Sequence, residues 1–146
     1  MKAQPVIVEK IFNKPIEKIW ESITKPESMR QWFFDNIPDF KPDKGFSTHF
    51  DVNANGKIYP HLWKVLEVEK MKRIVIEWRY GGYTGDSTAT FELIPGNNHI
   101  LFRVICEGIE TFPQDNPDFS RESCTAGWNY IIGTRLKEFL EKSNVK

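Results

Sequence analysis

Apolar and polar residues alternate through most of residues 46–107, and short turn sequences interrupt this alternation at hairpin spacing. Alternation of this kind is typical of antiparallel strands with one buried face. The stretch NANG at residues 53–56 contains the Asn-Gly pair of a tight hairpin turn, and YGGYTGD and PGNN supply later turns. We therefore predict antiparallel strands at residues 46–52, 61–70, 73–80, 87–94 and 99–107.

Helical signals lie on both sides of this run of strands. Pro15 opens a segment whose apolar residues recur at helical spacing, and Pro26 opens a second short segment that reaches Phe33. A β-branched stretch at residues 6–12 precedes both, and residues 124–142 form one long amphipathic segment. This order predicts an α+β fold in one domain spanning residues 1–146, with the last helix covering one face of the sheet.

The final helix carries a broad apolar arc. On an α-helical wheel the arc contains Cys124, Trp128, Ile131, Ile132, Leu136 and Phe139, with Leu140 at its edge. Gly127 lies at the margin of the arc, where we expect it to admit a close neighbour, and Gly133 lies outside it. A straight helix cannot touch a strongly twisted sheet along its whole length. We therefore predict a gap between them, filled by large side chains or by a ligand.

The charge balance argues against several classes of function. The 146 residues include 20 basic and 20 acidic side chains, for a formal net charge of +0. Without a basic run, the chain lacks the usual means of binding nucleic acid or an anionic membrane surface. It has no apolar run long enough to span a membrane and no signal-peptide core. With two cysteines and no CxxC pair, we expect a cytoplasmic protein with reduced thiols.

Three stretches carry a family resemblance: NKPIEKIWESITKPESMRQWF, FELIPGNNHILFRV and GWNYIIGTRLKEFLE. They resemble the SRPBCC (START-like) superfamily and, within it, the family of activators of the ninety-kilodalton heat-shock chaperone's ATPase, in its stand-alone bacterial form. The resemblance implies a helix-grip fold, in which a curved antiparallel sheet wraps around a long C-terminal helix, with two short helices near the N-terminus and a cavity inside. Its best signatures, such as Pro15, Trp20 and Trp128, are core and turn residues, which specify a fold more than a function.

The sequence shows no recognisable catalytic or metal-binding set. His49, His61 and His99 have no ligand-like spacing with each other or with the cysteines, so we predict surface or hydrogen-bonded histidines and no metal or cofactor. Cys106 and Cys124 fall among apolar residues, where a cysteine usually behaves as an inert small hydrophobe.

The predicted gap has a set of candidate ligand-binding residues. These are Trp78, Trp128, Ile131, Arg135, Phe102 and Phe50. Arg135 stands out because it falls inside the apolar arc. Its guanidinium either pairs with a sheet glutamate (Glu77, Glu92 or Glu107) or reaches water, or it anchors a ligand carboxylate or phosphate at the mouth of the gap. Arg121 is a second candidate for such an anchor.

Three functions stay open at this point. The first is non-catalytic binding of a small, mostly apolar molecule, with an acidic end if Arg135 contacts it. The resemblance implies the second, engagement of the bacterial ninety-kilodalton chaperone and stimulation of its ATPase. The third and weakest is a cyclase or hydratase, because the superfamily contains both. We expect no nucleic-acid or membrane partner.

Overall fold

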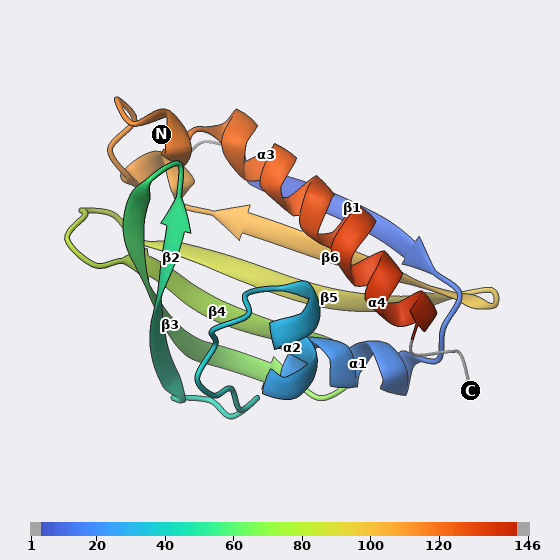
Figure 1. The fold of residues 1–146 in the computed structure, drawn as a ribbon. Helices are drawn as coiled ribbons and strands as arrows, with labels where there is room; N and C mark the ends of the chain where they lie inside the picture. The colour runs from blue at the N-terminus through green and yellow to red at the C-terminus, as the bar shows by residue number, and fades with distance from the viewer. Residues whose placement is uncertain (1–3, 143–146) are drawn as a thin grey trace.

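Six antiparallel strands form one curved sheet in the computed structural model, which describes residues 4–142. The strands are β1 (Val6–Phe12), β2 (Ser47–Ala54), β3 (Lys57–Glu69), β4 (Arg73–Tyr80), β5 (Ser87–Gly96) and β6 (His99–Glu107). Their order across the sheet is β1-β6-β5-β4-β3-β2, so the first strand pairs with the last and the others follow one another as hairpins. A long C-terminal helix crosses one face of the sheet (Figure 1), which confirms the predicted α+β helix-grip fold.

The turn between β2 and β3 follows the local chemistry of the sequence. Asn55 and Gly56 both have positive φ, at 56° and 81°, which asparagine and glycine tolerate better than other residues. The following strand, β3, begins at Lys57 rather than at the predicted residue 61. Pro60 is tolerated inside it because its carbonyl, and hence its nitrogen, faces the end of β4, where the Gly81 N–H donates to it at 2.9 Å. Pairing with β2 is therefore intact.

Two short helices and one long helix complete the fold. α1 (Ile16–Thr24) and α2 (Pro26–Trp32) lie near the C-terminal end of the long helix (Figure 1). The long helix consists of α3 (Arg121–Tyr130), a π-helical stretch η3 (Ile131–Leu136) and α4 (Lys137–Lys142). It begins earlier than the predicted start at Cys124 because the Ser120 Oγ accepts a hydrogen bond from the Ser123 N–H at 3.1 Å and so caps the first turn.

The π-helical stretch changes which residues face the sheet. The buried residues of the long helix are Trp128, Ile132, Leu136 and Leu140, which follow one another at intervals of four positions. On a continuous α-helix, steps of four drift by about 40° each, because each residue turns about 100°. The wider turns of η3 absorb this drift. The wheel prediction therefore holds for the core-facing arc but not for its centre: Cys124, Ile131 and Phe139 pack against the core only half-buried, whereas Leu140, predicted at the edge, is fully buried.

Aromatic rings fill much of the core between α2, the sheet and α3. Trp32 and Phe33 stack with ring centroids 4.8 Å apart, and Trp32 Nε1 donates to the Ser22 carbonyl at 2.7 Å. Phe33 also packs against Trp63 and Trp128, with centroids 5.4 Å and 5.5 Å away. All five tryptophans are buried.

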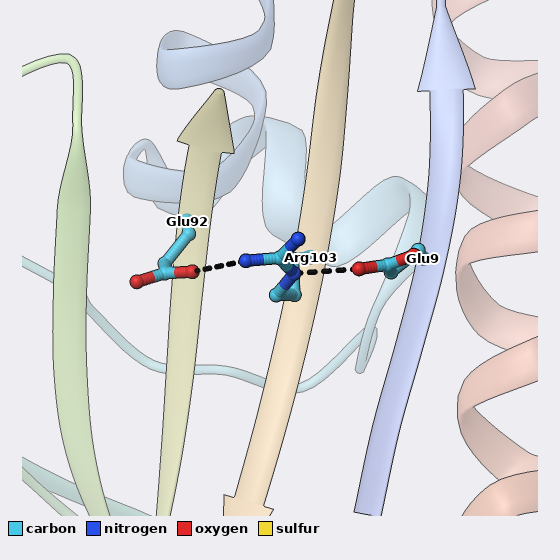
Figure 2. A network of polar contacts seen from close by, with 3 residues as sticks. All are labelled: Glu9, Glu92 and Arg103. Carbon is cyan, nitrogen blue, oxygen red and sulfur yellow. Dashed lines mark hydrogen bonds and ion pairs between the residues drawn. The ribbon is translucent and has the colours of Figure 1, made fainter.

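The opposite face of the sheet carries a row of charges. Arg103 on β6 lies between Glu9 on β1 and Glu92 on β5, and its guanidinium donates to their carboxylates at 2.6 Å and 3.4 Å (Figure 2). The strand register places the three residues directly opposite one another. Val8 and Val104, their neighbours along the strands, are buried on the other side. The core therefore lies on the face that the long helix covers.

Candidate ligand-binding cavity

A cavity of about 300 Å³ lies between the sheet and the N-terminal half of the long helix. Its wall comes from β2 to β6, from α3, and from the 3₁₀ turns η1 (Ile109–Thr111) and η2 (Pro117–Phe119) that connect β6 to α3. Gly127 of α3 is part of this wall, and a Cβ added there would meet nothing within 4 Å. The prediction that Gly127 admits a close neighbour was therefore wrong: the glycine faces open space. A Cβ at Gly133 would also meet nothing within 4 Å, but this residue does not line the cavity.

The structure divides the predicted cavity residues into two groups. Trp78, Trp128 and Ile131 lie on the cavity wall. Phe50 and Phe102 lie elsewhere in the core, where Phe50 packs on Trp63 with centroids 4.9 Å apart and Phe102 packs on Phe91 at 5.8 Å. Both follow the predicted inward alternation of their strands, but alternation does not indicate which inward residues pack against others. Ligand contact by the first group stays a prediction.

Arg135 has a partner that the sequence did not indicate. Its Nη1 donates to the Phe33 carbonyl at 3.0 Å and its Nη2 donates to the Gln31 carbonyl at 3.3 Å. These carbonyls lie at the end of α2, where a helix leaves its last carbonyls without internal partners. The guanidinium thus ties η3 to α2 instead of pairing with a sheet glutamate, and Arg135 is not among the residues that line the cavity. Arg121 likewise donates to the carbonyls of Gln4 and Pro5.

His61 is a buried polar residue of the cavity wall. It takes an inward position on β3, between Tyr59 and Trp63, and only 5% of its surface is exposed. Its Nδ1 lies 3.0 Å from the Tyr59 carbonyl. Because a carbonyl can only accept, Nδ1 carries the proton and Nε2 is left as an acceptor. Burial lowers the pKa of His61 to about 4, so the ring is neutral near pH 7.

His61 lines the cavity but was not among the predicted ligand-binding residues, although the sequence contains a signal for it. The alternation of β3 puts residue 61 in phase with the buried Tyr59, Trp63 and Val65. The spacing between histidines, by contrast, carries no information about this phase. The histidines were predicted to be at the surface or hydrogen-bonded: His49 is exposed, and His61 is buried with its Nδ1 hydrogen-bonded to the Tyr59 carbonyl.

Trp78 and Tyr80 add two more polar groups to the same region. Trp78 Nε1 is buried and has no hydrogen-bond partner among residues 4–142. The Tyr80 hydroxyl lies close to this indole, yet the two do not reach hydrogen-bond geometry. Burial raises the pKa of Tyr80 well above its usual range, so the phenol stays protonated. The centroid of the His61 ring lies 5.5 Å from that of Trp78 and 4.9 Å from that of Tyr80.

The two cysteines meet at the cavity wall. Cys106 comes from β6 and Cys124 from the first turn of α3, and the two thiols interact. The interaction with Cys124, together with burial, raises the pKa of Cys106, so this thiol stays protonated as expected for an inert residue. The interaction with Cys106 lowers the pKa of Cys124, and the nearby Arg121 adds to the effect.

A hydrogen-bond network holds one side of the cavity together. Tyr59 Oη donates to the Asp118 Oδ2 at 2.5 Å, and Asn55 Nδ2 donates to Oδ1 of the same carboxylate at 3.0 Å. These bonds connect the β2–β3 hairpin to η2, and the bond from Tyr59 lowers the pKa of Asp118. Among the lining residues that the structure describes, Asp118 is the only one charged at neutral pH.

No three His, Cys, Asp or Glu side chains within residues 4–142 gather so that they could hold a metal ion. Over the same range, no helix combines the length and the apolar character needed to cross a membrane.

Comparison with known proteins identifies relatives at the level of family and fold. Residues 13–141 match the family model described as "Activator of Hsp90 ATPase homolog 1-like protein". Protein MLL2253 from Mesorhizobium loti is similar over 97% of this chain and 100% of its own, with 26% identity and a TM-score of 0.74. BH1534 from Bacillus halodurans is 24% identical, with a TM-score of 0.71, over 95% of this chain and 98% of its own.

A third solved structure extends the likeness over the whole chain. A protein from Staphylococcus epidermidis is 18% identical, with a TM-score of 0.75, over 100% of this chain and 94% of its own. No curated protein matches this chain significantly. At these identities the solved structures of the Bacillus and Staphylococcus proteins support the fold alone.

Proposed function

This chain belongs to the family of Activator of Hsp90 ATPase homolog 1-like proteins, and we propose that it binds a small, mostly apolar molecule in the cavity between its sheet and its long helix. The family and its superfamily fold suggest a ligand-binding domain. The finer assignment, to this cavity and to this kind of molecule, is the proposal.

The cavity itself carries the proposal. The cavity is partly open to solvent, where exposed residues such as Asn55 and Ser123 line it, and it keeps about 300 Å³ free of protein atoms beside a tightly packed aromatic core. That volume lies at the lower end of the range of small-molecule sites. Nonpolar side chains such as Val52, Ala89, Ile109, Phe112 and Phe119 supply much of the wall. A few polar groups accompany them, which is the usual composition of a ligand pocket.

Native mass spectrometry of the protein purified from its own host tests this function. We expect a bound small molecule that appears as added mass under native conditions and disappears on denaturation. The same preparation, if free of ligand, should bind neutral bicyclic aromatic probes such as 2-methoxynaphthalene. A protein that carries no added mass and binds no such probe up to its solubility limit would contradict the proposal.

The two alternative functions have less support. Engagement of the ninety-kilodalton chaperone has only the family membership to support it, and an ATPase assay with and without this protein would test it. The cyclase or hydratase alternative stays a prediction from the resemblance, to be tested by turnover screening.

A further inference from the structure

Two polar atoms of cavity-lining residues, one acceptor and one donor, make no hydrogen bond within residues 4–142. His61 Nε2 is an acceptor with no hydrogen-bond partner among the described residues, since the ring's one hydrogen bond uses Nδ1. Trp78 Nε1 is a buried donor that is also without a partner in residues 4–142. A buried donor without a partner, such as Trp78 Nε1, is rare in native proteins because it loses its hydrogen bonds to water on burial. A bound molecule that accepts from Trp78 Nε1 would remove that cost, and it could donate to His61 Nε2 at the same time.

The two groups are placed to act on one molecule. His61 lies on β3 and Trp78 on the adjacent strand β4, both residues line the cavity, and their ring centroids are 5.5 Å apart. The Tyr80 hydroxyl, close to the Trp78 indole, also lines the cavity. Rings surround this region, with Phe34 edge-on to His61 at 5.1 Å and Trp128 edge-on to Trp78 at 5.9 Å. Aromatic walls of this kind favour a flat, apolar ligand.

The charges around the cavity argue against an anionic ligand. No lysine or arginine is among the described lining residues, and the one charged lining side chain is the carboxylate of Asp118. His61 is neutral near pH 7, so it accepts a hydrogen bond but offers no positive charge. Arg135 and Arg121, the cations predicted as anchors, donate to backbone carbonyls. A carboxylate or phosphate would enter the cavity without a counter-ion, which is costly.

We propose that the cavity selects an uncharged, flat molecule whose hydroxyl or N–H group donates to His61 Nε2 and which offers an acceptor to Trp78 Nε1. This rests on the proposed function of the cavity as a ligand site. It replaces the acidic end that Arg135 suggested at the level of sequence.

Three matched probes test the selection by calorimetric titration at pH 7. 2-Naphthol has a donor and an acceptor, 2-methoxynaphthalene keeps the frame and the acceptor but lacks the donor, and 2-naphthoate adds a negative charge. In the wild-type protein we expect 2-naphthol to bind roughly tenfold more tightly than the methyl ether, the worth of one hydrogen bond. The naphthoate should bind more weakly than both.

Variants then assign the preference to single residues. His61→Leu should remove the preference for 2-naphthol over the ether, and His61→Gln, which keeps an acceptor, should retain part of it. Trp78→Phe removes the donor and should weaken 2-naphthol and the ether by a similar factor. His49→Leu is the matched control, because this histidine lies exposed on β2 and should leave all three affinities unchanged.

The outcomes separate this inference from the proposed function. Equal affinity of the wild-type protein for 2-naphthol and its methyl ether would overturn the inference, while the cavity would still be a ligand site. This comparison uses the wild-type protein alone and does not depend on the folding of any variant. Preference for the naphthoate, or a naphthol preference that survives in folded His61→Leu, would also overturn it. Failure of all three probes to bind would contradict the proposed function as well.

Discussion

Arg135 Nη1 donates a hydrogen bond to the backbone carbonyl of Phe33 at 3.0 Å, across 102 positions of sequence. This contact explains why a charge occurs in the apolar stripe of the final helix. The helix not only covers the sheet but also completes the end of α2, whose following residue, Phe33, packs among the core rings. A charged donor is well suited to this task, because it satisfies two backbone carbonyls at once.

Replacement of Arg135 should therefore affect stability rather than binding. We expect Arg135→Met to lower the free energy of unfolding by about 1–3 kcal/mol, because two carbonyls lose a charged donor. Arg103→Met is the matched control, since that half-exposed arginine makes only surface ion pairs and its loss should cost about 0–1 kcal/mol. Urea denaturation measures both. An Arg135→Met protein with unchanged stability and a selective loss of acidic probes would instead support the ligand anchor predicted from the sequence.

The π-helical stretch makes a prediction about two adjacent residues. Leu140 is fully buried whereas Phe139 is half-buried, so Leu140→Ala should destabilise the protein by about 2–5 kcal/mol and Phe139→Ala by clearly less. A continuous α-helical wheel predicts the reverse order. Thermal or urea unfolding of the two variants side by side decides between them, and a larger loss for Phe139→Ala would show that the helix is phased as the wheel suggests.

The pKa of His61 predicts a loss of stability in mild acid. The pKa is about 4 in the folded protein against the ordinary value of 6.5, so between these limits the unfolded chain binds more protons. Stability should fall as the pH drops from about 6.5 towards 4, by about 2–4 kcal/mol in total, with no contribution from this residue above that window. His61→Gln should flatten the curve of unfolding free energy against pH, whereas His49→Gln should not. An unchanged slope in a folded His61→Gln protein would contradict this assignment.

The thiol pair predicts unequal reactivity. Cys124 should be alkylated by iodoacetamide faster than Cys106 near pH 7, because its pKa is lowered while that of Cys106 is raised and Cys106 is also more buried. Cys106→Ala removes the thiol that lowers the pKa of Cys124, so it should shift the alkylation rate profile of Cys124 to higher pH. Mass mapping of the modified peptides over a pH series measures this. Faster labelling of Cys106 would contradict the geometry of the pair.

The strands could be predicted from the sequence because strand signals are local. The predicted limits of β1, β4 and β6 agree with the structure at both ends, since alternation and turn residues such as Asn98 act over a few positions. Where the signals depend on tertiary contacts, the prediction failed. The π-helical phase of η3 is set by packing on the sheet, and nothing in the order of residues 131–136 announces it.

The candidate site was likewise predicted only where the signals in the sequence are local. A gap under the final helix followed from the twist of a sheet, and Trp78, Trp128 and Ile131 were predicted to face it from their periodicity. The sequence did not predict that the gap lies under the N-terminal half of the helix, because this depends on which side chains fill the space under the other half. The rings of Trp32 and Phe33 fill the space under the C-terminal half of the long helix, and the hydrogen bond from Arg135 holds them there. These are contacts between distant parts of the chain.

The pair of helical glycines offers the most direct test of the cavity as a ligand site. A side chain at either Gly127 or Gly133 enters open space, and each glycine weakens the helix by about 1 kcal/mol relative to alanine, so substitutions at both should fold. Only Gly127 lines the cavity. We predict that Gly127→Leu weakens the binding of 2-methoxynaphthalene at least roughly tenfold, because the new side chain occupies the ligand's space. Gly133→Leu should bind this probe as the wild type does. Equal affinities for the probe in both folded variants and the wild type would contradict the assignment of this cavity as the binding site.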